Sequence, residues 1–242
     1  MQYLALSLPS IAENLALDEA LLNEADQLSG AGREAEVLRI WELTEWAVVV
    51  GRATQVDQEV RRAACERDGI PVYRRCSGGT SVVAGPGCLM YAVLVSYEGR
   101  PELRSVDTAH HYVMERMQAG LSQLHEHVEF RGSCDLTIGD RKFSGNALRC
   151  KRKFLLYHGT VLYDFPLDRI SKYLATPPRQ PDYREGRDHA SFVTNFPADA
   201  TAIKDAIRGA WKAKVVADTW PEQATADLVR QRYSRATWNL GR

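Results

Sequence analysis

The sequence predicts an α+β domain whose sheet is largely antiparallel. Helical spacing of apolar residues occurs near both ends of the chain and once in its middle, whereas the segment after the middle helix has the two-residue period of strands. The chain has 242 residues, which corresponds to about 1.6 domains of ordinary size. Because it contains no repeat, low-complexity tract or evident linker, we expect a single domain over residues 1–242, with no C-terminal accessory domain.

The N-terminal half alternates predicted helices and strands. Ser10 and Glu13 have the Ser-x-x-Glu spacing of a capping box, which predicts the start of a helix that ends by Gly30 and Gly32. The segment Cys76–Gly87 has the weakest pattern of any part of the chain. The other predicted elements are strands over 36–43, 47–50, 71–75 and 89–96, and helices over 57–67 and 106–124.

The C-terminal half contains a predicted antiparallel meander. Gly139-Asp140 and Lys151-Arg152 are predicted turns, and they separate strands over 135–138, 141–149 and 154–163. A polar loop rich in Pro and Arg follows over 177–189. Amphipathic helices are expected over 200–214 and 224–233.

The composition excludes several classes of protein. The 31 Lys and Arg residues balance the 31 Asp and Glu residues, which argues against a nucleic-acid partner, because nucleic-acid-binding proteins usually carry a basic excess. No stretch approaches the roughly 18 apolar residues of a membrane-spanning helix, and the N-terminus lacks a signal-peptide pattern. We therefore expect a cytoplasmic monomer with no membrane partner.

The cysteines and histidines do not predict a metal site. The five cysteines are odd in number and none forms a Cys-x-x-Cys pair, so neither a disulfide framework nor a zinc site is expected. The histidines lack the four-residue spacing of a helical zinc pair. Most of the cysteines are expected to be reduced packing residues.

A glycine-containing loop follows the predicted strand 71–75. It consists of Arg74 and Arg75, then Cys76, and then Ser77-Gly78-Gly79-Thr80. Glycine lets the backbone approach a ligand closely, and exposed N–H and guanidinium groups bind anions. The pattern therefore fits an anion-binding loop, and it also fits an ordinary turn with solvated arginines.

Lys142 lies at the foot of the predicted hairpin. Strand alternation puts Lys142 and Ser144 on one face and Arg141 and Phe143 on the other. A lysine fixed there is a point charge for a phosphate or a polarised carbonyl oxygen; the alternative is a solvated hairpin lysine. Gly145 weakens the middle of the strand unless a bulge or a ligand lies close to it.

The next predicted strand contains His158-Gly159-Thr160 among Leu, Val and Tyr residues. The glycine again indicates that something approaches the backbone closely. The alternative for His158 is a hydrogen-bonded core histidine.

These three motifs together resemble those of the lipoate/biotin protein ligase superfamily, and most closely the catalytic domain of the lipoate–protein ligase A family. The loop is similar to the family's Arg-Arg-x-Ser-Gly-Gly, Lys142–Ala147 to its lysine motif, and His158–Thr160 to its His-Gly-Thr strand. Segments 14–19, 38–41 and 48–52 match as well, so the resemblance covers most of the chain. It implies a mixed sheet flanked by helices, related to class II tRNA-synthetase catalytic domains.

The resemblance also implies a reaction. Such ligases join lipoate to ATP, which arrives with Mg²⁺, and form lipoyl-AMP and pyrophosphate; they then transfer the lipoyl group to one lysine of a lipoyl carrier protein. Lys142 would be the catalytic residue, binding the α-phosphate and acyl carbonyl oxygens. The implied lipoyl-AMP contacts are Arg52, Arg75, Ser77, Gly78, Gly79, Thr80, Val82, Lys142, Gly145, Asn146, Ala147, His158, Gly159 and Thr160, and the implied nucleotide contacts are Asp135, Lys142, Asn146 and Ala147.

The chain also departs from the family's pattern. Thr80 replaces a third loop glycine, Ala84 and Gly85 replace a His-Asp pair, and Gly85–Leu89 is more similar to a run found in octanoyltransferases. Two alternatives therefore stay open. One is an octanoyl or lipoyl transferase that forms a thioester on Cys134 without ATP. The other is a lipoyl-adenylate-binding subunit that needs a small accessory chain.

Overall fold

The computed structural model describes residues 1–28, 30 and 32–241, and these form two sheets. The large sheet has the strand order β11 (Val215–Val216), β1 (Gln2–Leu4), β2 (Val37–Glu42), β6 (Cys88–Ser96), β10 (Phe154–Leu162), β9 (Arg141–Cys150), β8 (Asp135–Ile138) and β7 (Val128–Arg131). The small sheet has the order β4 (Val72–Arg74), β3 (Ala47–Val50) and β5 (Val82–Ala84). Strand β1 pairs in parallel with both of its neighbours, as does β3 with β4, and the other pairs are antiparallel.

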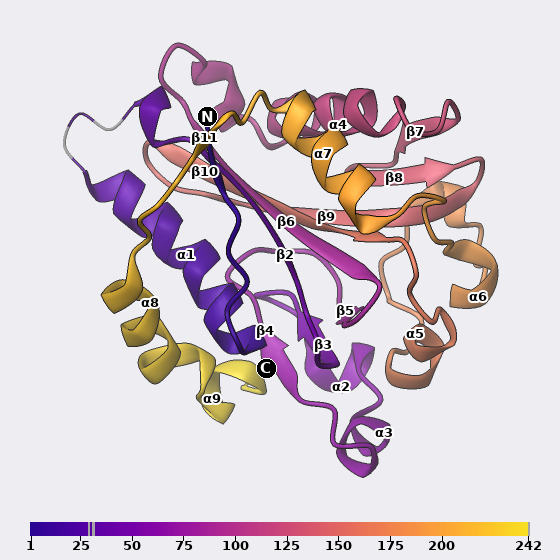
Figure 1. Ribbon diagram of the computed structural model, residues 1–242. Helices are drawn as coiled ribbons and strands as arrows, with labels where there is room; N and C mark the ends of the chain where they lie inside the picture. Colours follow the sequence, from indigo (N-terminus) through magenta and orange to yellow (C-terminus); the bar gives the residue numbers. More distant parts are fainter. Residues whose placement is uncertain (29, 31, 242) are drawn as a thin grey trace.

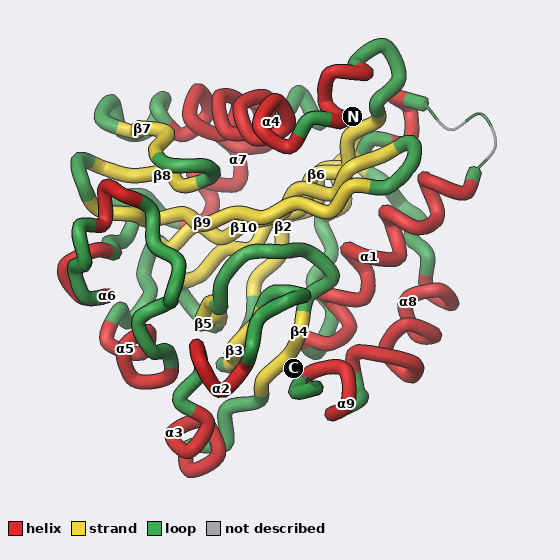
Figure 2. Tube along the Cα trace, turned by 180° about the vertical axis from the view of Figure 1, so that it is seen from behind, coloured by secondary structure: helices red, strands yellow, loops and turns green. Residues whose placement is uncertain are grey.

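Helices cover both faces of the large sheet (Figure 1). α4 (Val106–Leu121) and α7 (Ala200–Ala210) lie on one face, and α1 (Ile11–Gln27) and the small sheet lie on the other. Figure 2 shows from behind that α8 (Glu222–Leu228) runs beside α1, with α9 (Ala236–Asn239) following it. The α+β class with a mixed sheet between helices is therefore confirmed.

The shorter helical segments connect these layers. They are η1 (Arg33–Ala35), α2 (Val56–Glu59), α3 (Arg62–Arg67), η2 (Pro101–Arg104), α5 (Asp168–Tyr173), η3 (Asp182–Arg184), α6 (His189–Phe192) and the π-helical turn η4 (Val229–Tyr233). Both α5 and α6 lie at the end of the molecule where β8 and β9 meet (Figure 2). This end contains the cavities described below.

α1 begins where the capping box predicts. Ser10 Oγ accepts a hydrogen bond from the backbone N–H of Glu13 (3.2 Å), and the Glu13 carboxylate accepts one from the backbone N–H of Ser10 (2.9 Å). Leu15 and Leu17 are buried against the sheets. The same helix brings Asp18 into the protein interior, where it is 2% exposed.

Several elements differ from the sequence prediction. Strands β1, β5, β7 and β11 were not predicted; they have two to four residues, too few for a period-two pattern to be distinguished. β5 lies inside Cys76–Gly87, the segment with the weakest pattern. The helix predicted over 57–67 is instead α2 and α3, because Val60 between them is extended and forms a bridge with Leu174.

A β-bulge in the β8–β9 hairpin changes the predicted alternation. Leu136 pairs with Ser144 and Thr137 pairs with Lys142, so Phe143 is the extra residue. Consecutive residues of β8 point to opposite faces, and their partners in β9 do the same. The prediction that Lys142 and Ser144 share one face is therefore wrong.

Candidate functional site

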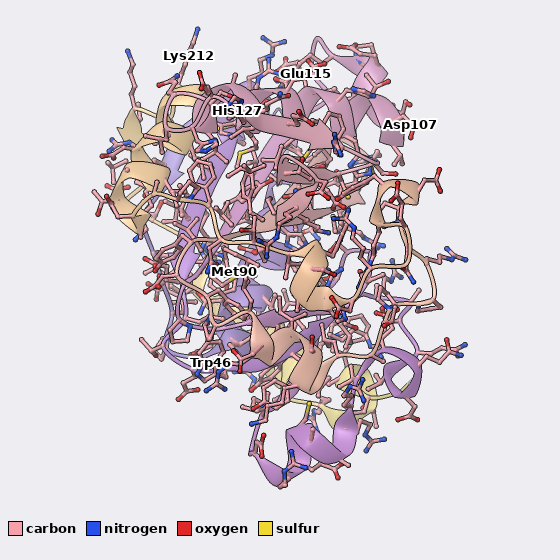
Figure 3. The ribbon with its side chains drawn as sticks, turned by 90° about the vertical axis from the view of Figure 1, so that its right-hand side faces the viewer. Trp46, Met90, Asp107, Glu115, His127 and Lys212 are labelled. Carbon is pink, nitrogen blue, oxygen red and sulfur yellow. The ribbon has the colours of Figure 1, made fainter. Side chains whose placement is uncertain are left out.

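A cavity of about 330 Å³ lies among α1, β3, β6 and the β9–β10 pair. We call it the acyl cavity, after the acyl group that the resemblance of the motifs implies beside Lys142. Leu15, Val49 and Met90 form its apolar wall. In Figure 3, Met90 lies in the middle of the molecule, between the helical layer with Glu115 and the small-sheet side with Trp46. Among the predicted site residues, those that line it are Arg75, Gly79, Thr80, Val82, Cys134, Asp135, Lys142, Gly145, Asn146, Ala147, His158, Gly159 and Thr160.

A second, smaller cavity of about 100 Å³ adjoins the first. We call it the base cavity, after the nucleotide base that the resemblance of the motifs implies. The two share Thr80, Val82, Lys142, Gly145 and Thr160. The other side chains around the base cavity are mainly apolar and include Val83, Leu162, Ile170, Leu174, Phe192 and Val193. Lys142 therefore stands where two cavities of different size meet.

Lys142 is held by an ion pair with a neighbouring strand. Its Nζ lies 2.6 Å from Asp135 Oδ1, and the lysine side chain remains 27% exposed. Gly145 makes this position available, because a Cβ there would lie 2.8 Å from Nζ and 2.9 Å from Cε of Lys142. The mid-strand glycine noted in the sequence is thus explained by the close passage of the lysine side chain.

Asp135 also connects the site to the polar loop 177–189. The Tyr183 hydroxyl donates a 2.8 Å hydrogen bond to Asp135 Oδ2. Burial raises the pKa of the Tyr183 phenol, so this hydroxyl stays a donor at neutral pH. The same loop contributes Arg179, Gln180 and Pro181 to the acyl cavity, none of which was among the implied contact residues.

Arg75 organises the glycine loop from within. Its guanidinium donates to Ser77 Oγ (3.1 Å) and to the carbonyl oxygens of Val49 (3.2 Å), Gly78 and Thr80 (2.9 Å). Burial lowers its pKa to about 10, which leaves it charged at neutral pH. Arg75 therefore lines the cavity while most of its donors hold the loop, unlike the solvated arginine of the alternative reading.

Arg74 faces another part of the protein. Its guanidinium donates to the carbonyl oxygens of Gly51 (2.7 Å), Thr54 (2.9 Å) and Trp238 (2.9 Å). Arg74 thus binds the segment that follows β3 and the C-terminal helix α9, whereas Arg75 binds the glycine loop. Both arginines are nearly inaccessible to solvent.

His158 connects the floor of the acyl cavity to the glycine loop. Its Nε2 lies 2.5 Å from Ser77 Oγ, and its Nδ1 lies 3.6 Å from Asp18 Oδ2. The side chain is 8% exposed and lines the acyl cavity. Both descriptions offered from the sequence therefore apply, since His158 is a hydrogen-bonded interior histidine at a cavity wall.

Asn146 and Cys134, which both line the acyl cavity, are joined by two hydrogen bonds. The Asn146 amide donates to the Cys134 carbonyl (2.7 Å), and the Cys134 thiol donates to the Asn146 carbonyl (3.0 Å). Tyr91 also donates to the Asn146 amide oxygen (2.5 Å). Burial raises the pKa of the Cys134 thiol, so it is mainly protonated at neutral pH.

Three predicted contact residues line neither cavity. Ser77 is buried behind the wall and Gly78 is exposed to solvent, and both accept hydrogen bonds from Arg75. Arg52 lines a separate polar hollow together with Arg149, Lys151 and Arg232. Conversely, Leu15 of α1 and Met90 of β6 in the apolar wall of the acyl cavity were not singled out, because they have the same apolar pattern as ordinary core residues.

The described residues contain no group of three or more His, Cys, Asp or Glu side chains placed to hold a metal ion. No described helix combines the length and the apolar character that crossing a bilayer requires. A metal ion carried by the phosphates of a nucleotide needs no such cluster of side chains.

Comparison with known proteins identifies the family. The lipoyl protein ligase A/B catalytic domain matches residues 10–220. A curated relative, "Probable lipoate-protein ligase A" of Mycoplasma pneumoniae, is 29% identical over 161 residues, which are 66% of this chain and 45% of the relative. The chain spans about half the length of the curated relatives it matches.

Solved structures share the fold. Protein Ta0514 of T. acidophilum with bound lipoic acid has a TM-score of 0.82 at 19% identity, covering 100% of this chain and 99% of that one. A lipoate-protein ligase A bound with ATP has a TM-score of 0.80 at 21% identity, covering 99% and 98%. A bipartite ligase of Thermoplasma acidophilum, described with its E2 lipoyl domain, has a TM-score of 0.77 at 21% identity, covering 99% and 96%. With the match over residues 10–220, the chain belongs to the lipoyl protein ligase A/B catalytic domain family.

Proposed function

We propose that this chain activates lipoate with ATP to lipoyl-AMP and transfers the lipoyl group to a lysine of a carrier protein. The observation that carries the proposal is the position of Lys142 at the junction of the two cavities. The larger cavity suits a flexible acyl chain, and the smaller apolar one suits a planar base. A mixed anhydride between acyl group and AMP would then lie beside the lysine ammonium.

Lys142 suits the first half-reaction. A lipoate carboxylate oxygen attacks the α-phosphorus of ATP, the bond from that phosphorus to the bridging oxygen breaks, and pyrophosphate leaves. Negative charge on the α-phosphate oxygens is offset by the ammonium of Lys142 once it exchanges Asp135 for the ligand. Mg²⁺ enters as part of the nucleotide substrate, held mainly by its phosphates.

The same lysine serves the second half-reaction. The amine of a carrier lysine attacks the acyl carbon, and charge develops on the carbonyl oxygen before AMP leaves. A cation fixed near that oxygen stabilises the tetrahedral state more than the ground state. The T. acidophilum structure described with an E2 lipoyl domain supports a carrier domain as the acceptor.

The thioester alternative finds less support in the site. A nucleophilic cysteine is normally one whose thiol pKa is lowered by a nearby cation or helix N-terminus. Cys134 has its thiol pKa raised by burial and donates its proton to the Asn146 carbonyl. These features favour a packing role for Cys134.

The need for a second subunit is a separate question that one experiment addresses. Pyrophosphate release from ATP is measured with the purified chain and lipoate, and no other protein present. We expect lipoate-dependent release by the chain alone. Absence of release from ATP, together with transfer from added lipoyl-AMP to a lipoyl domain, would instead identify one subunit of a two-chain ligase. Transfer from an acyl carrier protein without ATP would contradict the ligase proposal.

The role of Lys142 has a matched control. Lys142→Ala should lower pyrophosphate release by about 10²–10³-fold, the usual effect of removing one group that stabilises developing charge. Lys151→Ala, in the turn between β9 and β10, removes a lysine outside both cavities and should retain the wild-type rate. Equal rates for the two variants would contradict the assignment.

A further inference from the structure

A chain of buried polar side chains runs from α1 to the glycine loop. Arg39 Nη1 of β2 lies 2.6 Å from Asp18 Oδ1 of α1, and the other carboxylate oxygen of Asp18 faces His158 Nδ1 of β10 at 3.6 Å. His158 Nε2 then meets Ser77 Oγ at 2.5 Å. All four side chains are less than 9% exposed. Asp18 itself lines neither cavity.

The charges around the imidazole decide which ring nitrogen carries its proton. Asp18 is an acceptor, so it favours the proton on Nδ1, the nitrogen that faces it. Nε2 then has a free lone pair, and the Ser77 hydroxyl must donate to it. Ser77 Oγ in turn accepts from Arg75 Nε at 3.1 Å. The hydrogen-bond directions along this chain are therefore set at Asp18.

Arg39 keeps Asp18 in place for this purpose. Besides the ion pair, its guanidinium donates to the carbonyl oxygens of Asn14 (3.0 Å) and Leu6 (3.1 Å). A buried carboxylate without such a partner would be costly. The arginine compensates the charge of Asp18 and leaves the second carboxylate oxygen to face His158.

We infer that Asp18 is a positioning residue for lipoate binding and adenylation. By fixing the proton of His158 on Nδ1, it makes Nε2 the acceptor that anchors Ser77, and so holds the Ser77–Gly79 segment at the acyl cavity, where Gly79 forms part of the wall. This inference rests on the proposed function. It concerns how the cavity is held in shape, and no bond to substrate is assigned to Asp18.

The replacement Asp18→Asn gives a specific test. Arg39 would bind the amide oxygen, so the amide N–H group would face His158 Nδ1 and require that nitrogen to be an acceptor. The ring proton moves to Nε2, which reverses the hydrogen bond to Ser77. ¹⁵N NMR of histidine-labelled protein distinguishes the two tautomers, and the His158 signals are assigned by their loss in His158→Gln. This readout requires no activity.

The expected result is a change of the His158 tautomer together with weaker lipoate binding. In wild type we expect Nδ1 protonated and Nε2 unprotonated at pH 8, and in Asp18→Asn the opposite. We expect KM for lipoate to rise about tenfold or more, because the reversed bond takes from the buried Ser77 hydroxyl proton the acceptor that it has in wild type. The matched control is Asp26→Asn on the same helix, where a side-chain oxygen accepts from the Lys153 backbone N–H (2.6 Å) and Asn preserves that bond.

Separate outcomes identify which proposal fails. A wild-type His158 protonated on Nε2 at pH 8, or equal KM values for Asp18→Asn and Asp26→Asn, would overturn the inference about Asp18. If Asp18→Asn does not fold, Ser77→Ala keeps the Asp18–Arg39 pair and should show the same rise in KM; an unchanged KM there would also overturn the inference. Absence of lipoate-dependent pyrophosphate release in wild type would contradict the proposed function and leave the tautomer measurement valid.

Discussion

Gly145→Ala tests whether the exact place of Lys142 controls the reaction. An alanine Cβ would lie 2.8 Å from Lys142 Nζ and 2.9 Å from Cε. Ordinary contacts between such atoms are about 3.5–4.0 Å, so the lysine end must move by about 0.7–1.2 Å. The atoms in the way are the end of a flexible side chain, so the strand itself has no reason to shift.

The expected effect on rate is therefore much larger than the effect on stability. A misplacement of about 1 Å in a positioning group lowers rates by about 100-fold. The free energy of unfolding should change by less than about 1 kcal/mol, because alanine loses less backbone entropy than glycine in a strand and this offsets part of the crowding. We expect lipoate-dependent pyrophosphate release to fall about 100-fold while the unfolding midpoint moves by only a few degrees.

The assay pairs pyrophosphate release with thermal unfolding, and the control is Gly209→Ala. A Cβ on Gly209, in α7, meets no atom of the described residues within 4 Å, and alanine in a helix is about 0.8–1.0 kcal/mol more favourable than glycine. The control should be slightly more stable and fully active. A wild-type rate for Gly145→Ala would refute the reasoning about the lysine, and a collapse in stability would show that the strand, not the side chain, takes up the strain.

Three further predictions follow from contacts around the same cavity. Gly159→Ala would put a Cβ 1.7 Å from Asn146 Oδ1 and 2.9 Å from a backbone oxygen, so its free energy of unfolding in denaturant should fall by about 1–3 kcal/mol; wild-type stability would contradict the packing described. Cys134 has a thiol pKa raised by burial, so its alkylation in the folded protein, followed by mass spectrometry, should be slow at pH 8 and accelerate as the pH rises; rapid labelling at pH 7 would instead indicate a reactive thiolate. Arg75→Lys cannot reproduce the fork that binds three carbonyl oxygens, and it should destabilise the protein by about 1.5–3 kcal/mol and raise KM for lipoate; an unchanged KM would show that the loop holds its shape without the guanidinium.

Sequence patterns predicted the parts of this protein that depend on local chemistry. The capping box of Ser10 and Glu13 sets the start of α1 within the chain itself. The meander followed from its turns and its two-residue period, and β8 has the predicted bounds of Asp135–Ile138. Gly145 and Gly159 indicated that another group lies close to the backbone at these positions. The structure identifies that group as the side chain of Lys142 at Gly145 and of Asn146 at Gly159.

The rest of the site depends on contacts between distant segments. The apolar wall of the acyl cavity combines Leu15, Val49 and Met90, which come from α1, β3 and β6. Each has the apolar pattern of an ordinary core residue, and only the packing of the two sheets with α1 leaves them beside a space. Asp18 was likewise one residue of a matching segment, and its link to His158 and Ser77 exists only once three elements meet.

The bulge at Phe143 adds one residue to β9, and this lets Lys142 and Gly145 face the cavity while Phe143 packs in the core. Strict alternation over Lys142–Gly145 would set Lys142 and Gly145 on opposite faces, although the lysine must pass over that glycine to reach Asp135. The extra residue restores the match: Lys142 and Gly145 share the cavity face, while Phe143 packs against Phe196 with ring centroids 4.9 Å apart. A strand without the bulge could keep Lys142 and Phe143 on their present faces, but it would turn Gly145 away from the cavity. The irregularity is therefore the feature of β9 that places the lysine at the junction of the two cavities.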